Sequence, residues 1–394
     1  MTPQARAQAA IELLDGIIDA ARAGGAAADT LIARYFKERR YAGSKDRRAV
    51  RDLVYAAIRQ CADAPASGRA AMLALAEQQP ELAVMFDGSP HAPAPIRADE
   101  ERAAPGAVPS WLMPHLAAPV LDSAEQAALL ERAPLDLRVN ALKASPDEVR
   151  AYFPDAVPLE GLPHALRFTE AENVEQSRSY EDGLIEIQDA GSQLIALACN
   201  AAPGMTMIDL CAGAGGKALA LAADMAGQGR LIAADVNRDR LSRLPERATR
   251  AGAGFIETLL LDAGKEAAAL APLAGLADVV LVDAPCSGTG TWRRNPEARW
   301  RLNADRLNRL VAEQSRILDL AAPLVRPGGR LVYAVCALTH AEGAEQIDAF
   351  LARHPSWRTA DTAVAKGRKY GEGRLLTPAH DGTDGFFIAA LVRI

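Results

Sequence analysis

Residues 205–217 read Met205-Thr-Met-Ile-Asp-Leu-Cys-Ala-Gly-Ala-Gly-Gly-Lys217, an apolar run that ends in a glycine-rich turn. The run has the length of a buried strand, and a helix is expected to begin after the turn. Glycines let the chain turn tightly and bring its backbone close to a ligand, because no Cβ stands in the way. The stretch therefore predicts a strand–turn–helix unit of an α/β sheet, with a ligand at the turn.

Two acidic residues after the next apolar runs narrow the kind of ligand. Asp235 ends the second run, about 20 residues on, where a carboxylate can accept hydrogen bonds from a ribose diol, and Asp262 ends the third. No Ser or Thr follows Lys217, so the turn is not a triphosphate-binding loop. The acids suit a nucleoside that carries a positive charge, such as S-adenosylmethionine. The alternative is that these carboxylates cap helices.

The second half of the chain has the pattern of a mostly parallel sheet. Apolar runs alternate with helical stretches, as expected when strands are buried on both faces. We therefore predict a doubly wound α/β fold. The expected strands cover residues 205–210, 230–234, 258–261, 278–282, 330–335 and 386–392.

Two cysteines follow two of these predicted strands. Cys286 lies in Asp283-Ala-Pro-Cys286-Ser-Gly-Thr-Gly, and Cys336 lies in Leu331-Val-Tyr-Ala-Val-Cys336-Ala. Ligands of open α/β sheets bind at the carboxyl ends of the strands. Two thiols at one sheet edge predict a site that uses sulfur chemistry twice. Most free cysteines are small buried hydrophobic residues, and this remains the interpretation for Cys61, Cys199 and Cys211.

The first half of the chain has a different sequence pattern, with mostly helical spacing of its apolar residues. Apolar residues recur at helical spacing in residues 3–24 and 46–60, and Ser44 is a plausible cap for the second helix. Residues 87–110 are dense in proline and predict a linker. Residues 135–140 alternate like a strand, Ser145 and Pro146 can start a helix, and residues 166–169 can form a return strand. We expect a helical domain followed by a small α+β insert.

Composition excludes several classes of protein. The chain has 394 residues, 49% of them hydrophobic and 24% charged, which is typical of a globular protein of two or three domains. Five cysteines without a CxxC motif predict reduced thiols, no metal site and a cytoplasmic location. No signal-type segment and no membrane-spanning apolar stretch is found. The net charge of −6 means that any nucleic-acid binding must depend on local patches.

The segment Asp283-Ala-Pro-Cys286-Ser-Gly-Thr-Gly-Thr-Trp-Arg-Arg-Asn-Pro-Glu297 resembles the signature of RNA cytosine-5 methyltransferases. Within that superfamily the chain is most similar to the RsmB (Fmu/Sun) type. Further matching pieces are 137–140, 188–193, the glycine turn and 380–387. Residues 44–60 resemble the NusB-like helical domain of RsmB proteins.

The resemblance implies a fold and a division into domains. The expected domains are a NusB-like all-helical domain (1–88), a proline-rich linker with a connecting helix (89–125), a small α+β RNA-binding subdomain (126–183) and a Rossmann-like methyltransferase domain (184–394). The resemblance also implies methylation of carbon 5 of a cytosine in RNA, above all small-subunit ribosomal RNA, by a cytoplasmic enzyme that we expect to be monomeric and independent of membranes. Other RNA substrates such as transfer RNA, a DNA methyltransferase and a non-catalytic RNA-binding assembly factor remain the alternatives.

The resemblance also implies roles for individual residues. Cys336 would add to carbon 6 of the base, and Cys286 would assist elimination and release. Asp283 would hydrogen-bond the cytosine ring, and Lys217 would lie near the target base. The implied S-adenosylmethionine-binding residues are Leu210, Cys211, Ala212, Gly213, Ala214, Gly215, Gly216, Lys217, Asp235, Arg240, Asp262 and Asp283.

The sequence departs from the family pattern at two places. Val335 and Ala337 flank Cys336, where the family has hydroxyl residues, and Gly213-Ala214 replaces the family's Ala-Pro in the turn. Three stretches are candidates for RNA contact by their composition: eight basic residues between Arg34 and Arg51, the run from Trp292 to Arg301 that interleaves tryptophan and arginine, and a late patch of Lys366, Arg368, Lys369 and Arg374. For the basic residues between Arg34 and Arg51, the alternative to RNA contact is that they only form a solvent-exposed helix face.

Overall fold

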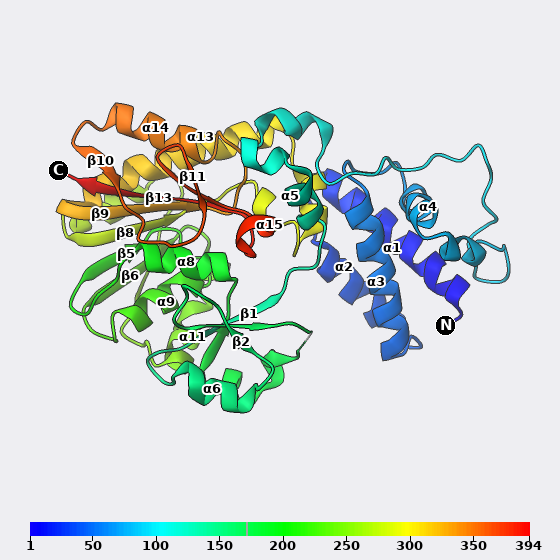
Figure 1. Cartoon of the computed structure of the whole chain (residues 1–394), viewed down its shortest axis with the longest axis horizontal. Coiled ribbons are helices and arrows are strands. Elements are labelled where there is room, and N and C mark those ends of the chain that lie inside the picture. Colours follow the sequence, from blue (N-terminus) through cyan, green and yellow to red (C-terminus); the bar gives the residue numbers. More distant parts are fainter. Residues whose placement is uncertain (171) are drawn as a thin grey trace. The chain divides into compact units, whose positions relative to one another are not determined.

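The computed structural model describes residues 1–170 and 172–394. The chain forms two compact units (Figure 1). The helical unit contains Met1–Arg132 and also Thr291–Arg306, and the sheet unit contains Ala133–Gly290 and Leu307–Ile394. The sequence assigned residues 291–306 to the second domain, whereas they pack with the first unit.

The helical unit is built on four α-helices that bury apolar faces against one another, among them Leu14, Ile17 and Ile58. Their bounds are α1 Pro3–Ala23, α2 Ala28–Glu38, α3 Ser44–Gln60 and α4 Gly68–Gln78. Both sequence-predicted helices are confirmed. Ser44, however, is the first residue of α3 and not its cap: Gly43 holds the cap position, with no side-chain hydrogen bond.

The proline-rich stretch follows this bundle. Short 3₁₀ segments lie at Pro80–Met85, Ser110–His115 and Ala118–Leu121, and α5 spans Ser123–Ala128. Between Met85 and Ser110 the structure has neither helix nor strand apart from one isolated bridge, Cys61 with Pro105. Irregular backbone in this stretch is what its density of proline predicts.

Residues 291–306 close the ends of the bundle's helices. Glu297 accepts a hydrogen bond from the amide of Ala28 at the start of α2. Arg299 donates to the carbonyls of Ile58 and Arg59 at the end of α3, and the indole of Trp300 donates to the carbonyl of Cys61 just beyond it. Helix ends leave such groups without partners inside the helix, so this segment supplies their caps.

This packing corrects the RNA-contact hypothesis for the run from Trp292 to Arg301. Trp292 and Arg299 are 1% exposed and Trp300 is 8% exposed, so none of the three can stack on a base. Arg301 donates to the carbonyls of Ala20, Gly25 and Ala26 near the end of α1. The aromatic and cationic side chains are used to complete the helical unit.

The α+β insert opens the sheet unit. Its four-stranded antiparallel sheet has the order β2-β3-β1-β4, with β1 Leu135–Val139, β2 Val157–Pro158, β3 Ala165–Phe168 and β4 Ile185–Ile187. Its helices are α6 Pro146–Tyr152 and α7 Arg178–Glu181, with a 3₁₀ turn at Val174–Gln176. Ser145 caps α6 in a capping box with Glu148, as its sequence predicts. Because β4 pairs with β1, the insert's sheet extends past residue 183.

The large sheet has nine strands, and five of them form the predicted parallel core in the order β7-β6-β5-β8-β9. Their bounds are β5 Thr206–Asp209, β6 Arg230–Asp235, β7 Glu257–Leu260, β8 Ala277–Asp283 and β9 Val325–Val335. β13 (Phe386–Arg393) runs antiparallel to β9, and three strands absent from the sequence prediction join it: β10 Trp357–Ala360, β11 Arg368–Tyr370 and β12 Gly373–Leu376. The Rossmann-like α/β class is confirmed.

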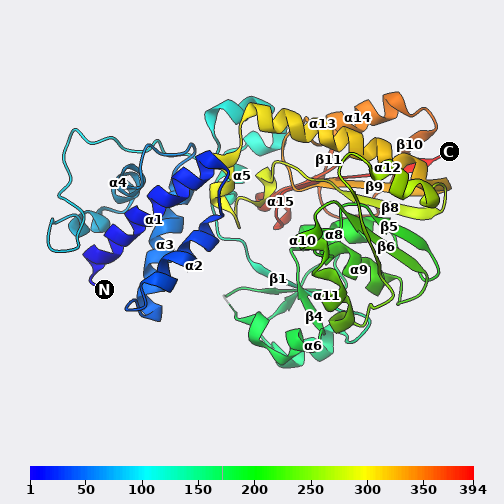
Figure 2. The ribbon, with the colours of Figure 1, turned by 180° about the vertical axis from the view of Figure 1, so that it is seen from behind.

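Helices cover both faces of this sheet, with α8 and α9 on one side and α13 and α14 on the other (Figures 1 and 2). The α-helices are α8 Ala190–Ala198, α9 Gly216–Asp224, α10 Arg238–Leu241, α11 Leu244–Ala251, α12 Glu266–Leu270, α13 Ala304–Ala321, α14 Ala344–Arg353 and α15 Pro378–Asp381. The remaining 3₁₀ turns are Ala271–Leu273, Thr289–Thr291, Pro296–Arg301 and Ala322–Leu324. Within the described residues, no helix is both long and apolar enough to cross a membrane, and no cluster of three His, Cys, Asp or Glu could hold a metal ion.

Candidate active site

The strand order places the candidate site at the centre of the sheet. From β5 the chain moves outward through β6 and β7, then returns to the other side of β5 with β8. In open α/β sheets ligands bind where the order reverses, outside the carboxyl ends of the strands. Here those ends carry the glycine turn, after β5, and Asp283, the last residue of β8.

The glycine turn has a backbone that a side chain would disturb. Gly215, the residue before α9, has φ +85, and a Cβ there would lie 2.2 Å from the side chain of Leu244. Asp235 accepts hydrogen bonds from the amides of Gly213 and Asn237, both at 2.7 Å. Asp235, the acid predicted to bind the ribose, therefore also fixes the turn. Arg240 packs against Gly213, since a Cβ added to Gly213 would meet the guanidinium of Arg240.

A buried carboxylate beneath the turn gives a test of the ligand's charge. Asp209 is 1% exposed, and neither of its oxygens has a hydrogen-bond partner that meets normal geometry among the described residues. Burial, followed by the negative charge of Asp283, raises the pKa of Asp209 to about 7. A cationic nucleoside would relieve this charge, whereas an anionic one would add to it. The site therefore fits S-adenosylmethionine. No sequence motif marks Asp209 for this role.

The other residues predicted to bind cofactor lie at the same sheet edge to different depths. Leu210, Ala212 and Gly213 are buried, Ala214 and Gly216 are half-buried, and Asp262 is exposed just after β7. Burial raises the pKa of the Cys211 thiol well above its usual value, so Cys211 is protonated and contributes its backbone rather than its sulfur.

The two cysteines meet because their strands are neighbours in register. Asp283 on β8 pairs with Ala334 on β9, so the chain leaves both strands side by side. The Sγ atoms of Cys286 and Cys336 lie 3.2 Å apart. The amide of Gly290 donates to the carbonyl of Cys336 at 3.0 Å, which ties the two loops together.

The charges around the pair distinguish its members. A hydrogen bond to Cys336, then burial, raise the pKa of the Cys286 thiol well above its usual value. Lys217 donates to Asp283 at 2.6 Å. Burial alone would lower the pKa of Lys217, but the charge and hydrogen bond of Asp283, and the charge of Cys336, outweigh it and raise that pKa. Cys336 therefore has the ammonium of Lys217 nearby and shares a hydrogen bond with the thiol of Cys286.

A buried glutamate that sequence reasoning missed holds the Cys286 loop. Glu342 is 0% exposed, and its carboxylate accepts four hydrogen bonds. Oε1 receives the amide of Ser287 at 2.7 Å and the amide nitrogen of Gln314 at 3.0 Å, and Oε2 receives the hydroxyls of Ser287 at 2.6 Å and Thr339 at 2.8 Å. No motif marked this residue, since it belongs to an irregular loop between β9 and α14.

The atypical flanks of Cys336 lie in the protein interior. Val335 and Ala337 are both 0% exposed. Hydroxyl groups near the pair come instead from the opposite loop, where Thr289 accepts a hydrogen bond from the amide of Leu338 at 2.7 Å. Apolar flanks leave no buried hydroxyl to be satisfied there.

The remaining predicted positions separate into buried and surface groups. Cys61 and Cys199 are 0% exposed, as expected for packing thiols. In the late basic patch, Arg368 and Arg374 donate to groups of the same hairpin, Lys366 donates to the carbonyl of Asp381, and Lys369 is exposed.

A doubly wound sheet with a glycine turn, a ribose-type acid and a buried carboxylate at its switch point fits the class of S-adenosylmethionine-dependent methyltransferases. A family model described as 16S rRNA methyltransferase RsmB/F matches residues 196–392. The chain belongs to this RsmB/F methyltransferase family.

Similar proteins agree with this placement. The chain is 34% identical over 297 residues to the probable ribosomal RNA small subunit methyltransferase B of Synechocystis sp., with 72% of this chain and 66% of that protein covered. It is 35% identical over 307 residues to the ribosomal RNA small subunit methyltransferase B of Xylella fastidiosa, with 75% and 70% covered.

Solved structures share the fold. The crystal structure of PH0851 has a TM-score of 0.76 at 24% identity and covers 100% of this chain and 99% of that one. NSun6 from Pyrococcus horikoshii, solved with SFG, has a TM-score of 0.62 at 19% identity and covers 68% of this chain and 93% of that one.

Proposed function

We propose that this chain uses S-adenosylmethionine to methylate carbon 5 of a cytosine in RNA, with small-subunit ribosomal RNA as its substrate. The observation that carries the chemistry is the thiol pair, with Sγ atoms 3.2 Å apart, next to the ion pair of Lys217 and Asp283. Relatives in the same family are named for methylation of small-subunit ribosomal RNA, which supports the substrate.

Carbon 5 of cytosine is a weak nucleophile, and the proposed roles of the thiols follow from that. The Cys336 thiolate adds to carbon 6, and the electron pair of the 5,6 double bond moves toward carbon 5. S-adenosylmethionine supplies the methyl group that carbon 5 takes. Nitrogen 3 takes up a proton from water as the thiolate adds, which balances the added negative charge, and Asp283 favours this protonation by accepting a hydrogen bond from that N–H. Lys217 keeps the carboxylate and the thiolate in place. Loss of the carbon 5 proton then expels Cys336 and restores the double bond.

The electrostatic surroundings of Cys286 determine at which step of the reaction its thiol can act as a base. Before the reaction, the hydrogen bond to Cys336 is the largest cause of the raised pKa of Cys286. Once Cys336 is bonded to carbon it carries no charge, so this cause disappears and Cys286 loses its proton more easily. Cys286 therefore becomes a better base at the step that needs one, which supports its assignment to release.

The substrate is tested by methyl transfer in vitro. Small-subunit ribosomal RNA, transfer RNA and DNA, all from cells that lack this protein, are incubated with it and with tritiated S-adenosylmethionine, and the products are digested and analysed for 5-methylcytosine. We expect label in the small-subunit RNA, at one cytosine that bisulfite sequencing locates. Label only in transfer RNA or DNA would select those alternatives. Cofactor binding without transfer to any substrate would select the assembly factor.

Glu342 gives a prediction about the position of Cys286. Glu342→Ala should lower turnover by about 10²-fold, because the amide and the hydroxyl of Ser287 both lose the carboxylate that accepts from them and the adjacent thiol moves. Glu342→Gln should recover most of the activity, since the hydroxyls of Ser287 and Thr339 can turn to accept from the new amide. The measurement is kcat for each variant at saturating cofactor, together with cofactor affinity, which we expect to stay unchanged. Equal losses in both variants would mean that charge, not positioning, is what Glu342 provides.

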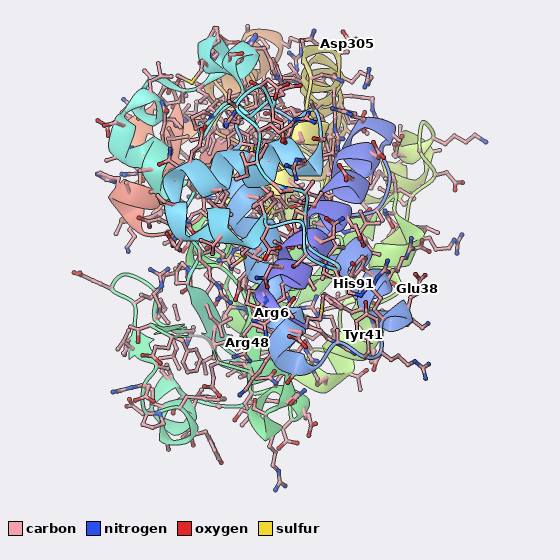
Figure 3. All side chains as sticks on the ribbon, turned by 90° about the vertical axis from the view of Figure 1, so that its right-hand side faces the viewer. Arg6, Glu38, Tyr41, Arg48, His91 and Asp305 are labelled. Carbon is pink, nitrogen blue, oxygen red and sulfur yellow. The ribbon has the colours of Figure 1, made fainter. Side chains whose placement is uncertain are left out.

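The basic stretch on the helical unit is a candidate surface for RNA. Among its eight basic residues, Arg34, Lys37, Arg40, Lys45 and Arg48 are exposed, and their side chains form no ion pair or hydrogen bond with the described residues. Tyr41, 74% exposed, and Arg48 stand on the outside of this unit (Figure 3). Unpaired cations beside an exposed aromatic ring match the chemistry of phosphate and base contact.

Replacing Arg40 and Arg48 together by glutamine should weaken RNA binding. The slope of log K against log salt concentration should fall by about 1 for each lost phosphate contact. Filter binding at several salt concentrations measures both quantities. Arg358→Gln, on exposed residue Arg358 of β10 in the sheet unit, is the matched control. If the control weakens binding as much as the double variant, the stretch is a solvated helix face and not a specific surface.

A further inference from the structure

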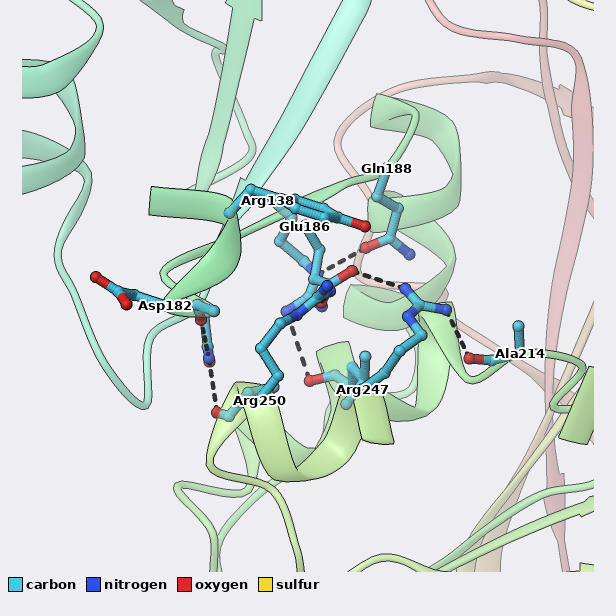
Figure 4. A network of polar contacts seen from close by, with 12 residues as sticks. Arg138, Asp182, Glu186, Gln188, Ala214, Arg247 and Arg250 are labelled. Atoms are coloured by element: carbon cyan, nitrogen blue, oxygen red, sulfur yellow. Dashed lines mark hydrogen bonds and ion pairs between the residues drawn. The ribbon is translucent and has the colours of Figure 1, made fainter. Parts of the chain in front are cut away.

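Two arginines of α11 share one buried carboxylate of the insert, but only one of them reaches the cofactor turn. Glu186 on β4 is 3% exposed. One of its oxygens accepts from Arg247 at 2.7 Å, and the other accepts from Arg250 at 2.5 Å (Figure 4). A buried carboxylate requires such pairing, and the two half-buried guanidinium groups supply it, so this cluster is ordered in the folded protein.

Arg247 makes a second contact that Arg250 does not make. Its Nη1 donates to the carbonyl oxygen of Ala214 at 2.6 Å, while Nη2 holds Glu186 (Figure 4). Ala214 lies in the middle of the glycine turn. The planar guanidinium therefore connects a strand of the insert to the backbone of the turn through two charge-assisted hydrogen bonds.

The residue two positions after Glu186 reaches the same turn. The side-chain amide of Gln188 donates to the carbonyl of Gly216 at 3.4 Å and to the hydroxyl of Ser192 at 3.1 Å. Its oxygen accepts from the buried Arg138 at 2.7 Å, which fixes the orientation of the amide (Figure 4). Residues two positions apart point to the same side of a strand. Glu186 in β4 and Gln188 just after it therefore point to the same side, and both are linked to the glycine turn.

We infer that Arg247, held by Glu186, is a positioning residue that keeps the glycine turn in the shape that binds the cofactor. Gly213 and Gly215 both have positive φ, at +55 and +85. Glycine-rich backbone has more conformations to lose than any other, and a ligand that must order it binds more weakly. Pinning the carbonyl of Ala214 between the two glycines removes that freedom before the cofactor arrives.

The shape of the cofactor turn depends on contacts with the insert within the sheet unit. Glu186 belongs to the insert's sheet, Arg247 to α11 and Ala214 to the loop after β5. The insert therefore adds to the ordering of the cofactor turn, beside the hydrogen bond that Asp235 accepts from Gly213. The role of Arg247 and Glu186 rests on the proposed use of S-adenosylmethionine. These two residues raise the affinity for the cofactor without touching it.

The test compares two arginine variants of the full-length protein. Arg247→Met removes both contacts of the guanidinium, whereas Arg250→Met removes a pair with the same Glu186 and leaves the turn untouched. Calorimetric titration with S-adenosylhomocysteine gives the dissociation constant of each. We expect it to rise about tenfold in Arg247→Met and by less than about twofold in Arg250→Met. At saturating S-adenosylmethionine, kcat of both variants should stay near that of the unmodified protein, so the loss in Arg247→Met should be in KM.

The outcomes separate this inference from the proposed function. If the unmodified protein does not bind S-adenosylhomocysteine, the proposed cofactor itself is wrong. If it binds, and the two variants weaken binding equally or not at all, Arg247 acts only in the fold and the inference is overturned. Should Arg247→Met fail to fold, Arg247→Lys replaces it in the same comparison, because an ammonium cannot hold Glu186 and the Ala214 carbonyl in the two-pronged geometry.

Discussion

Replacement of Cys336 by alanine should abolish methyl transfer, with a fall in rate of at least about 10³-fold. Its Sγ is the proposed nucleophile, and no neighbouring thiol can replace it. The hydrogen bond to Cys336 is lost in this variant, but burial still raises the pKa of Cys286, and burial also raises the pKa of Cys211. The measurement is transfer of tritiated methyl groups to small-subunit ribosomal RNA.

Cys61→Ala is the matched control for this prediction. Cys61 is a fully buried thiol of the helical unit, and burial raises its pKa to about 11. Removing it should leave the rate unchanged, since it only packs. Substantial methyl transfer by Cys336→Ala would contradict the proposed nucleophile, provided that S-adenosylhomocysteine binds this variant as it binds the unmodified protein.

Replacement of Cys286 by alanine should have the opposite effect on the reaction's intermediate. Attack and methyl transfer need only Cys336, so the covalent bond to RNA forms. Release needs a base at carbon 5, and the nearest thiol, 3.2 Å from the nucleophile, has been removed. We therefore expect a protein–RNA adduct to accumulate. It is measured as a band of reduced mobility on a denaturing gel that ribonuclease treatment shifts back.

A second substitution identifies which cysteine carries the RNA. In a protein with both Cys286→Ala and Cys336→Ala, no adduct should form, because no nucleophile remains. If Cys336→Ala alone accumulates the adduct and Cys286→Ala does not, the two roles are exchanged. If neither single variant nor the unmodified protein forms a bond to RNA while methylation continues, the reaction does not pass through a thiol adduct.

Strong local patterns were predictable from the sequence, and weak ones were not. All six predicted apolar runs became strands, and five of them are largely buried, whereas β7 is exposed or half-buried along its length. The strands β10, β11 and β12 escaped prediction, since each contains basic residues that interrupt the apolar pattern and each is ordered by pairing with β13 or with its neighbour.

Composition could not distinguish between two uses of the same side chains. The arginines and tryptophans from Trp292 to Arg301 resemble a nucleic-acid surface in sequence. In the structure Arg299 and Trp300 donate to carbonyls at the end of α3. A guanidinium meets the carbonyls of a helix end and the oxygens of a phosphate through the same hydrogen bonds, and only tertiary packing decides which it meets.

The sequence by itself determined the glycine turn, the acids after the strands and the placement of Cys286 and Cys336 at strand ends. These features are local, because each depends on a few adjacent residues and on the period of the strands. Only the tertiary structure decided the register that brings the two sulfur atoms to 3.2 Å, the burial of Asp209 and Glu342, and the link from Glu186 through Arg247 to the turn. Those depend on contacts between residues far apart in the chain, which no local pattern encodes.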